Sequence, residues 1–315
     1  MKSILSAKHF HDEAAAYSFL EERVWPNGPV CPHCGGVERI SKMQGKSTRI
    51  GTFKCYQCRM QFTVKVGTVF EASHVKLHIW LQAVALLASS KKGISSNQLH
   101  RTLGVSLKTA WFMSHRIREA MRDGKLAPMG GGDGIVEMDE TYHGKVAVPR
   151  DVTTSGRPYT KTGKSGPSNK RAIVSLVERG GSVRSFHIEH ADKSTINVIV
   201  GGNIAREARL HTDESRLYND ALQHVAAHET VHHASGEYVR GDVHTNTVEG
   251  VFSVFKRGMK GTYQHCAEKH LHRYLAEFDF RYNNRVALGV NDLARADHAL
   301  KGIVGKRLTY RTANK

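Results

Sequence analysis

The stretch Val243–Gly258, VHTNTVEGVFSVFKRG, has the pattern of an amphipathic helix with an unusual polar edge. Its apolar residues recur at helical spacing and form one stripe: Val248, Val251, Phe252, Phe255 and Met259. Glu249 and Lys256 are seven residues apart, about two helical turns, so they lie almost directly above one another at the edge of that stripe. An ordinary surface helix accounts for this stretch when it is taken alone. The rest of the chain therefore decides whether the polar edge is a site.

The composition predicts a protein that binds a polyanion. The 315 residues include 46 Lys and Arg against 29 Asp and Glu, which gives a formal net charge of +17 and a pI near 9.8. This excess favours nucleic acid over a membrane surface. There is no apolar run of the roughly 18 residues that a membrane helix needs, and acids interrupt the start of the chain where a secretory peptide has its apolar core. We expect a cytoplasmic, nucleoid-associated protein without a membrane partner.

Four of the five cysteines form two CxxC pairs with the spacing of a structural zinc ribbon. Cys31 and Cys34 make the first pair, Cys55 and Cys58 the second, and twenty residues lie between them. Four thiolates around one Zn²⁺ leave no open position for water, so the metal would hold the fold without catalysing a reaction. Two disulfides or unrelated thiols are the alternative, and a reducing compartment disfavours them. His33, inside the first pair, is interpreted as a surface residue.

A helix-turn-helix is predicted after the ribbon. Ser95 or Ser96 caps a first helix that runs through Leu103, Gly104 makes the turn, and a longer helix opens at Ser106. Helical hairpins with a glycine turn also occur in proteins that never touch DNA, but the basic ribbon and the net charge favour DNA binding here. The second helix would present groups suited to phosphates and base edges: Ser106, Lys108, Thr109, His115, Arg116 and Arg118.

Beyond a glycine-rich linker at 124–134 the pattern changes from helices to strands, interrupted by a basic loop at 145–170. The order is three strands, helix, strand, helix, strand, helix, which is that of the ribonuclease H-like fold, an α/β fold with a mixed five-stranded sheet and helices. The expected elements are strands at 135–138, 171–179 and 182–190, a helix at 192–208, a strand at 208–214, a helix at 215–224, a strand at 238–243, the helix quoted above and a final amphipathic helix at 267–285.

In that architecture the ends of the first and fourth strands and the last helix of the order converge. Here these places hold Asp139, Asp213 and Glu249. Three carboxylates suit two divalent cations, Mg²⁺ or Mn²⁺, that share one bridging Asp. One cation would generate the attacking oxygen, and the other would stabilise the leaving 3′-oxygen of a DNA strand. Lys256 and Lys145 are placed to hold phosphates against the metals.

Four further polar residues next to these acids are interpreted as scaffold. Glu140 and Glu214 directly follow the two Asp residues, and because neighbours on a strand face opposite sides we expect them to point away from the site unless the strand has already ended. His211 and His244 flank the same segments. Metal-bound water needs no general base, so we expect both to be scaffold or phosphate contacts.

Four segments together resemble the ISXO-like DDE transposases of bacterial insertion sequences. This family joins an N-terminal zinc ribbon to a ribonuclease H-like catalytic domain, and the resemblance covers nearly the whole chain. It implies that Asp139, Asp213 and Glu249 are the metal-binding catalytic acids and that Lys256 is the lysine seven residues further on. Some relatives have asparagine as the third residue, so Asn246 is the alternative to Glu249 or its companion. The segments are EMDETYHGK (137–145), LHTDESRLY (210–218), HTNTVEGVFSVFKRGMKGTYQHC (244–266) and KHLHRYLAEFDFRYNNR (269–285).

Together these patterns predict an insertion-sequence transposase. It would bind terminal inverted repeats, cleave the 3′ ends of its element with metal ions, and transfer those strands to target DNA. Two ends have to be paired, so a homodimer or higher oligomer is expected on the double-stranded DNA. The expected segments are an N-terminal helix (1–25), the zinc ribbon (26–70), the helix-turn-helix region (71–128), the catalytic domain (129–290) and a basic C-terminal tail (291–315).

Two alternatives stay open on the sequence. The chain could be a zinc-ribbon and helix-turn-helix regulator with an inactive nuclease-like domain, although all three acids and Lys256 are retained. It could also be a structure-selective DNA nuclease of the same fold, although its N-terminal readers favour defined ends over junction shape. A nicking assay separates the first alternative from a transposase, and a strand-transfer assay separates the second.

Overall fold

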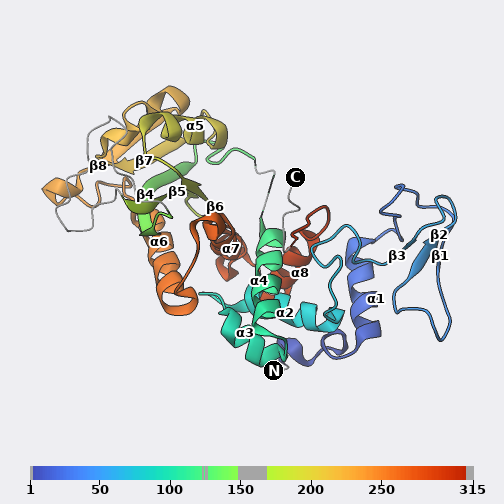
Figure 1. The fold of residues 1–315 in the computed structure, drawn as a ribbon. Helices are drawn as coiled ribbons and strands as arrows, with labels where there is room; N and C mark the ends of the chain where they lie inside the picture. The colour runs from blue at the N-terminus through green and yellow to red at the C-terminus, as the bar shows by residue number, and fades with distance from the viewer. Residues whose placement is uncertain (1–2, 123, 125–126, 148–168, 310–315) are drawn as a thin grey trace. The chain divides into compact units, whose positions relative to one another are not determined.

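The computed structural model describes residues 3–122, 124, 127–147 and 169–309. They form two units, drawn as a ribbon in Figure 1. One unit combines residues 1–122 with residues 284–315, and the other consists of residues 123–283. Most of the basic loop expected at 145–170 lies outside the described residues. No helix in the described part of the chain is both long and apolar enough to cross a membrane.

The first unit is mainly helical and carries a small antiparallel sheet. Its N-terminal helix is capped by Asp12, whose carboxylate accepts the backbone N–H of Ala15 at 2.7 Å. Glu13 in the same helix reaches across the unit and accepts the N–H of Leu77 at 2.8 Å, at the start of another helix. The elements are α1 (Glu13–Val24), β1 (Ile40–Lys42), β2 (Phe53–Cys55), β3 (Gln61–Phe62), α2 (Leu77–Ser89), α3 (Ser96–Leu103), α4 (Leu107–Met121) and α8 (Asp292–Lys301), with sheet order β1-β2-β3.

The helices α3 and α4 begin and end where the sequence signals predict. Ser95 accepts the N–H of Gln98 at 3.1 Å, and Ser106 accepts the N–H of Thr109 at 3.1 Å, so each serine caps its helix. Gly104 ends α3 in the left-handed region at φ 64°, a conformation that favours glycine. The two helices joined by a glycine turn are therefore encoded by local signals.

Arg116 does not face outward as expected. Its guanidinium is buried and donates to the carbonyl oxygens of Val69 at 2.9 Å and Glu71 at 2.8 Å, and to that of Leu308 at 3.1 Å. Arg118 donates to the hydroxyl of Ser114 one turn earlier. Arg116 thus fastens two other chain segments to α4, because a guanidinium offers several donors to carbonyl groups. The bond from Arg118 lies within α4 itself, at a buried position. The expectation that these two arginines would contact DNA was wrong.

Residues 303–305 also pack within the first unit. The region expected as a tail from 291 onward includes α8, and the backbone beyond it pairs with the segment that follows the ribbon. The N–H of Gly305 donates to the carbonyl of Gly67 at 2.8 Å, and that of Val69 donates to Ile303 at 3.2 Å. The domain boundary at residue 290 remains a prediction.

The second unit is built on a mixed five-stranded sheet of order β6-β5-β4-β7-β8. Strand β5 is antiparallel to both of its neighbours, whereas β4, β7 and β8 are parallel. This order and these directions define the ribonuclease H-like fold. The bounds are β4 (Ile135–Lys145), β5 (Lys170–Glu178), β6 (Val183–Ile188), α5 (Lys193–Asn203), β7 (Arg209–Asp213), β8 (Ala227–Val231), α6 (Asn246–Gly258) and α7 (Leu271–Asn283).

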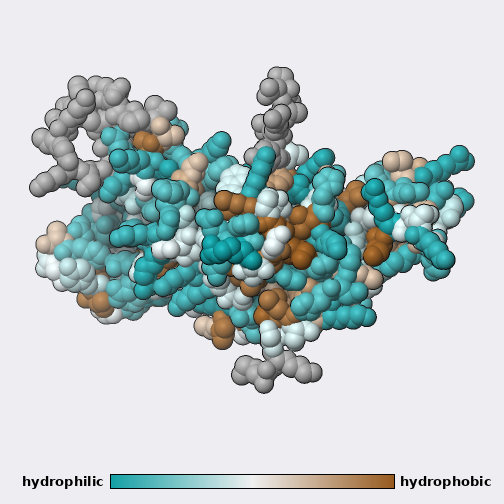
Figure 2. All heavy atoms as spheres, turned by 60° about the horizontal axis from the view of Figure 1, so that its bottom comes forward, coloured by the Kyte–Doolittle hydropathy of each residue, from teal (hydrophilic) through white to brown (hydrophobic). Residues whose placement is uncertain are grey.

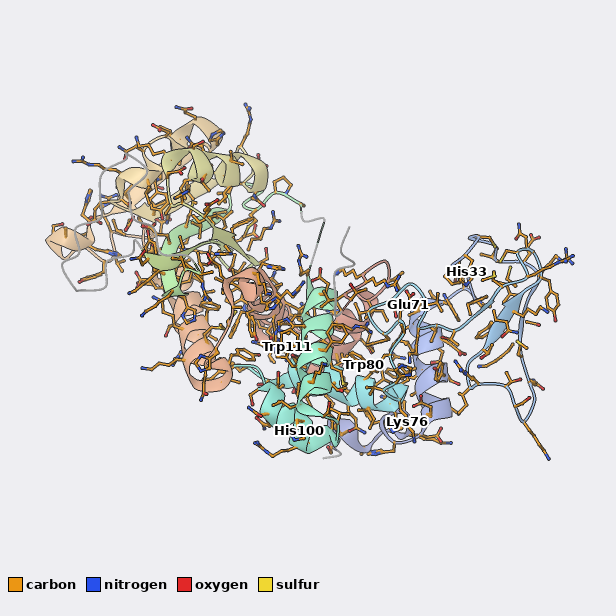
Figure 3. The ribbon with its side chains drawn as sticks, in the orientation of Figure 1. His33, Glu71, Lys76, Trp80, His100 and Trp111 are labelled. Carbon is orange, nitrogen blue, oxygen red and sulfur yellow. The ribbon has the colours of Figure 1, made fainter. Side chains whose placement is uncertain are left out.

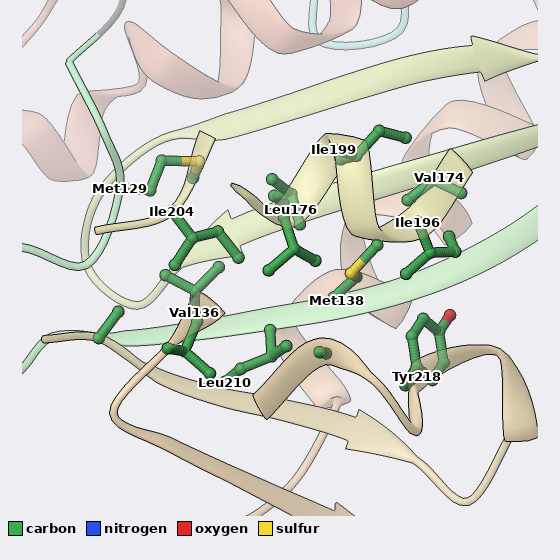
Figure 4. Close-up of a cluster of buried hydrophobic side chains, with 14 of the residues drawn as sticks. Met129, Val136, Met138, Val174, Leu176, Ile196, Ile199, Ile204, Leu210 and Tyr218 are labelled. Carbon is green, nitrogen blue, oxygen red and sulfur yellow. The ribbon is translucent and has the colours of Figure 1, made fainter. Parts of the chain in front are cut away.

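Helices cover the two faces of this sheet because each central strand is apolar on both sides. On β5, Val174 and Leu176 enter one cluster with α5, while Ile173 and Val177 enter the other with α6 and α7. Figure 4 shows the first cluster, in which α5 lies over the strands and Leu176 is surrounded by apolar side chains. The alternation along one strand thus divides the core into two layers.

The fifth strand lies elsewhere than the sequence suggested. The strand expected at 238–243 is wrong, because the described backbone there makes an isolated bridge between Arg240 and Val243. Gly236 and Gly241 adopt positive φ and interrupt that region. The strand that pairs with β7 is Ala227–Val231, whose mostly polar sequence AHETV lacks an apolar alternation. The helix expected at 215–224 is likewise replaced by two short 3₁₀ turns.

We predict that Leu176→Ala lowers the free energy of unfolding of the second unit by about 2–5 kcal/mol, because it leaves a cavity around a fully buried position. Val198→Ala is the matched control, since Val198 is 73% exposed on α5 and its loss should cost within about 0.5 kcal/mol. Urea unfolding of both variants measures the difference. Equal stabilities would contradict the assignment of Leu176 to the core.

Candidate active site and metal centre

Four cysteine sulfurs in the first unit lie close enough to bind one metal ion. The Sγ atoms of Cys31, Cys34, Cys55 and Cys58 are all within 4.8 Å of one another. Cys31 is 3.6 Å from Cys58, and Cys34 is 3.7 Å from Cys55. Tetrahedral Zn²⁺ with bonds of about 2.3 Å separates its sulfurs by about 3.8 Å, so the four residues fit this metal. His33 is exposed outside the cluster, at the position labelled in Figure 3.

Backbone amides favour the thiolate form of one cysteine, Cys55, whereas burial and the neighbouring thiols raise the pKa of Cys58. The N–H groups of Cys58 and Gln57 hydrogen-bond to the sulfur of Cys55 and lower the pKa of that thiol to about 7. A thiolate is the form that binds zinc, so these amides favour the ligating state. Four sulfur ligands leave no place for a reacting water, and the centre is structural.

The second site starts from the register of two parallel strands. In the pairing of β4 with β7, Ile135 lies level with Arg209 and Glu137 with His211, an offset of 74 residues in both cases (209 − 135 and 211 − 137). The same offset places Asp139 level with residue 213, which is the Asp that ends β7. The two aspartates are therefore brought to the same edge of the sheet by strand pairing.

Helix α6 adds the third acid. Glu249 lies in its first turn, and the hydroxyl of Thr245 donates to Glu249 Oε1 at 3.0 Å. Asn246 and Lys256 are exposed on the same edge of the helix as Glu249, in agreement with the stripe read from the sequence. The opposite edge is buried against the sheet through Val248 and its apolar neighbours.

The electrostatics show that these carboxyl groups are neighbours. Burial raises the pKa of Asp139 to about 8, and the charges of Glu140, Asp213 and Glu249 add to the shift. Burial also raises the pKa of Asp213, with further contributions from Glu214 and Glu249, against the lowering effect of a hydrogen bond from the N–H of Ser215. Burial and neighbouring acids thus raise the pKa of Asp139 and of Asp213, and a divalent cation would favour the ionised forms of both.

The acids form an open group. Among the described residues, only the cysteines bring three or more ligand atoms of the relevant types within 4.8 Å of one another. Glu249 is about half exposed, with 48% of its side-chain surface accessible. An open arrangement leaves coordination positions for substrate oxygens and water, as metal-assisted hydrolysis requires.

The two glutamates that follow the aspartates serve other partners. Glu140 accepts a hydrogen bond from the hydroxyl of the buried Tyr218, on the α5 side of the sheet. Glu214 accepts the backbone N–H groups of His233 and Ala234, each at 2.9 Å. The direction of Glu140 follows from the alternation along β4, whereas Glu214 lies beyond the end of β7 and is held by the amides of 233–234. Burial and the charge of Asp213 still raise the pKa of Glu140.

His233 is a residue that the sequence reasoning missed. Its Nε2 lies 4.0 Å from Glu249 Oε1, and its charge acts to lower the pKa of Asp213. The bonds from Glu214 hold its backbone in place. The sequence carries no signal for this, because 16 residues separate His233 from Glu249 and a long-range contact places it there.

The two candidate lysines lie further along the site. Lys256 is two turns from Glu249, roughly 10 Å along the helix axis. Burial lowers the pKa of His143, and the charges of Arg171 and Lys256 add to this effect, so Lys256 is a neighbour of His143. Lys145 is exposed at the end of β4, where its carbonyl accepts from Arg171 at 2.7 Å.

Comparisons with known proteins agree with this architecture. Residues 132–283 match the ISXO2-like transposase domain, and residues 11–61 match the transposase zinc-ribbon domain. The chain is 29% identical over 283 residues to an uncharacterized protein in transposable element ISH50 of Halobacterium salinarum, which covers 88% of this chain and 93% of that protein.

Solved structures share less sequence identity with this chain. A chain of the simian T-cell lymphotropic virus intasome in complex with PP2A regulatory subunit B56 gamma is 13% identical, with 57% of this chain and 63% of that chain covered and a TM-score of 0.27. The chain therefore spans less than two thirds of that matched chain. The Mos1 strand transfer complex matches at 14% identity, 67% of this chain, 78% of that chain and a TM-score of 0.23. At these scores the superpositions add nothing to the topology described above.

The zinc ribbon, the ribonuclease H-like sheet and the two domain matches define a transposase. The chain belongs to the ISXO2-like transposases of insertion sequences.

For the cysteine centre we predict about one zinc ion per chain, because four sulfurs converge on one point. Cys31→Ser should lose the metal and unfold the ribbon, since a buried ligand is removed. Cys266→Ser should keep it, because that thiol lies outside the cluster. Elemental analysis of the purified variants decides the matter, and full zinc content in Cys31→Ser would contradict the assignment.

For the acidic site we predict that the protein without added magnesium loses stability as the pH rises. An unfolded Asp titrates near pH 4, whereas the folded pKa of Asp139 is about 8. Between these values the folded state holds a proton that the unfolded state has released, so the free energy of unfolding falls with increasing pH. Asp139→Asn should therefore stabilise the protein at pH 8, by on the order of 2 kcal/mol, and not at pH 4.

Thermal unfolding at the two pH values tests this, with Asp220→Asn as the control. Asp220 forms a surface ion pair with Lys193 at 3.5 Å and should leave the pH dependence unchanged. A melting temperature of Asp139→Asn that follows the wild type at both pH values would contradict the electrostatic description.

Proposed function

We propose that this transposase binds the terminal inverted repeats of its element, cleaves their 3′ ends and joins them to target DNA with divalent cations. The observation that supports the proposal is the neighbourhood of Asp139, where the charges of Asp213 and Glu249 add to the raised pKa of its carboxyl. A buried carboxyl with a pKa of about 8 costs stability at neutral pH, and a function that needs its charge explains why the fold retains it.

The acids would hold two Mg²⁺ or Mn²⁺ ions, with Asp139 between Asp213 and Glu249. When bound, such ions supply an activated oxygen nucleophile and stabilise the leaving oxygen of a phosphodiester. The protein's own part is to fix the carboxylates. The strand register orients the two aspartates, Thr245 orients Glu249 through its hydroxyl, and the exposed Asn246 is placed to join it as a ligand.

The lysines and His233 extend the site along the path of a nucleic acid. Lys256 and Lys145 are exposed and positively charged, so each would contact a phosphate on either side of the reacting bond. His233 lies beside Glu249, and its backbone N–H donates to the carboxylate of Glu214. The direction of DNA through the site would then follow the exposed edge of α6.

End recognition is assigned to the first unit. The exposed start of α4 carries Ser106 and Lys108, with Thr109 beside them, which suits contacts with phosphates and base edges. The ribbon exposes further basic residues, and hydrophilic side chains cover most of the face shown in Figure 2. Because two ends have to be cut and joined together, the active form would be a homodimer or larger assembly on double-stranded DNA.

We predict that Asp139→Asn and Asp213→Asn leave binding of a repeat-ended DNA intact and lower Mg²⁺-dependent nicking by at least about a hundredfold. Loss of a metal ligand removes several kcal/mol of stabilisation from the transition state, and each 1.4 kcal/mol is about tenfold in rate. Gel-shift and nicking assays on one labelled substrate measure both properties.

Asp220→Asn is the matched control and should nick at the wild-type rate, because Asp220 lies on the surface of the same unit. Nicking that survives the change of either aspartate would refute the metal site. A wild-type protein that binds the ends without nicking would be the regulator with an inactive domain. A protein that nicks branched DNA and never transfers a strand would be the structure-selective nuclease.

A further inference from the structure

Glu137 is a buried carboxylate that the metal chemistry does not use. It lies in β4 two residues before Asp139, so both side chains point to the face of the sheet that α6 covers. Its side chain is completely buried. Burial of a carboxylate is tolerated where hydrogen bonds compensate for lost hydration.

Those hydrogen bonds come from the start of α6. Glu137 Oε2 accepts the backbone N–H of Thr247 at 2.8 Å and that of Val248 at 3.1 Å. Its Oε1 accepts the hydroxyl of Thr247 at 2.7 Å. The N-cap residue, Thr245, accepts no backbone N–H of the helix with its side chain, whose hydroxyl donates to Glu249 instead. The cap of α6 is therefore supplied by a strand 110 residues earlier in the chain.

Arg179 holds the segment that enters this helix. Its Nε donates to Glu137 Oε1 at 2.6 Å, and its other nitrogens donate to the carbonyls of Asp242 at 2.6 Å and His244 at 3.1 Å. The ring Nδ1 of His244 lies 3.2 Å from Glu137 Oε1. One carboxylate and one guanidinium thus fix both the entry and the first turn of α6.

We propose that Glu137 is a positioning residue that sets Glu249 against Asp139. Glu249 directly follows Val248, whose amide Glu137 holds, and Asp139 follows Glu137 by two residues on the same strand. The carboxylate therefore links two metal ligands that are far apart in sequence, without touching the metal. This role rests on the function proposed above, and residues that orient ligands in this way affect metal affinity or activity about 10- to 100-fold.

Glu137→Gln tests this role because an amide has only one acceptor oxygen. Whichever way the amide turns, its NH₂ group meets either the helix amides or Arg179, and one set of donors loses its acceptor. We expect the Mg²⁺ concentration for half-maximal nicking to rise about tenfold or more, with binding of the DNA ends unchanged. Data are corrected for the folded fraction, measured by thermal unfolding.

Asp279→Asn is the matched control for a purely structural effect. Asp279 is another buried carboxyl of the same unit, and it accepts the N–H and the hydroxyl of Ser185, each at 2.7 Å, which fastens α7 to β6. It should lower stability and leave the Mg²⁺ midpoint unchanged. A midpoint for Glu137→Gln equal to that of Asp279→Asn would overturn the proposal.

Hydrogen exchange gives a readout that needs neither DNA nor magnesium. In Glu137→Gln the amides of Thr247 and Val248 should exchange faster than in the wild type, while those at the centre of α7 do not. If the wild type shows no nicking but these two amides exchange faster in the variant, the proposed reaction is refuted and the capping role of Glu137 is supported. Unchanged exchange at both amides overturns the cap itself.

A milder variant covers the case in which Glu137→Gln does not fold. Thr247→Val removes one hydroxyl donor to Glu137 Oε1 and keeps both backbone bonds. It should shift the Mg²⁺ midpoint in the same direction by a smaller factor, of about threefold, as expected for one bond of a positioning set. A midpoint equal to wild type in this variant would also count against the proposal.

Discussion

The parallel pairing of β4 with β7 is the constraint on which the second unit depends. The register of residues 135–137 with residues 209–211, continued by two residues, sets Asp139 level with Asp213. Asp213 is the last residue of β7, whereas β4 runs on to Lys145. In open α/β sheets ligands gather at the carboxyl ends of parallel strands, which here is the end of β7. Helix α5 makes the crossover that parallel pairing requires, and its own cap, Asp192, accepts the N–H of Thr195 at 2.8 Å. The local cap of α5 and the long-range pairing of β4 with β7 therefore favour the same arrangement.

The carboxyl groups of this unit differ in how far hydrogen bonds compensate for burial. Glu137 accepts bonds from Arg179 and from the start of α6, so it fastens a helix to a strand. Asp279 accepts the N–H and the hydroxyl of Ser185, but burial still raises its pKa to about 7. Asp139 accepts one backbone N–H, from Glu140 at 2.7 Å, and is surrounded by other acids, so its charged form is disfavoured. The structure thus places its least satisfied acid beside its most satisfied one, two residues away on one strand.

Local chemistry made much of this fold predictable. The CxxC pairs, the Gly180–Gly181 hairpin and the serine caps each act within a few residues, and each of these elements is present. These local signals predicted the zinc cluster and the order along the chain of the first four strands of the second unit. The features that the sequence did not predict depend on contacts between residues far apart in the chain. Strand β8 is paired through its backbone and has little apolar patterning, Arg116 is buried by carbonyls of other segments, and His233 is brought to Glu249 by Glu214.

The backbone pairing of Gly305 with Gly67, and of Ile303 with Val69, has a consequence for synthesis on the ribosome. The first unit cannot form these bonds until residues 303–305 have been translated, after every residue of the second unit. The contacts of the first unit are therefore completed only after the sequence of the second unit has been made. A chain that stops before residue 303 contains the second unit but lacks these contacts in the first.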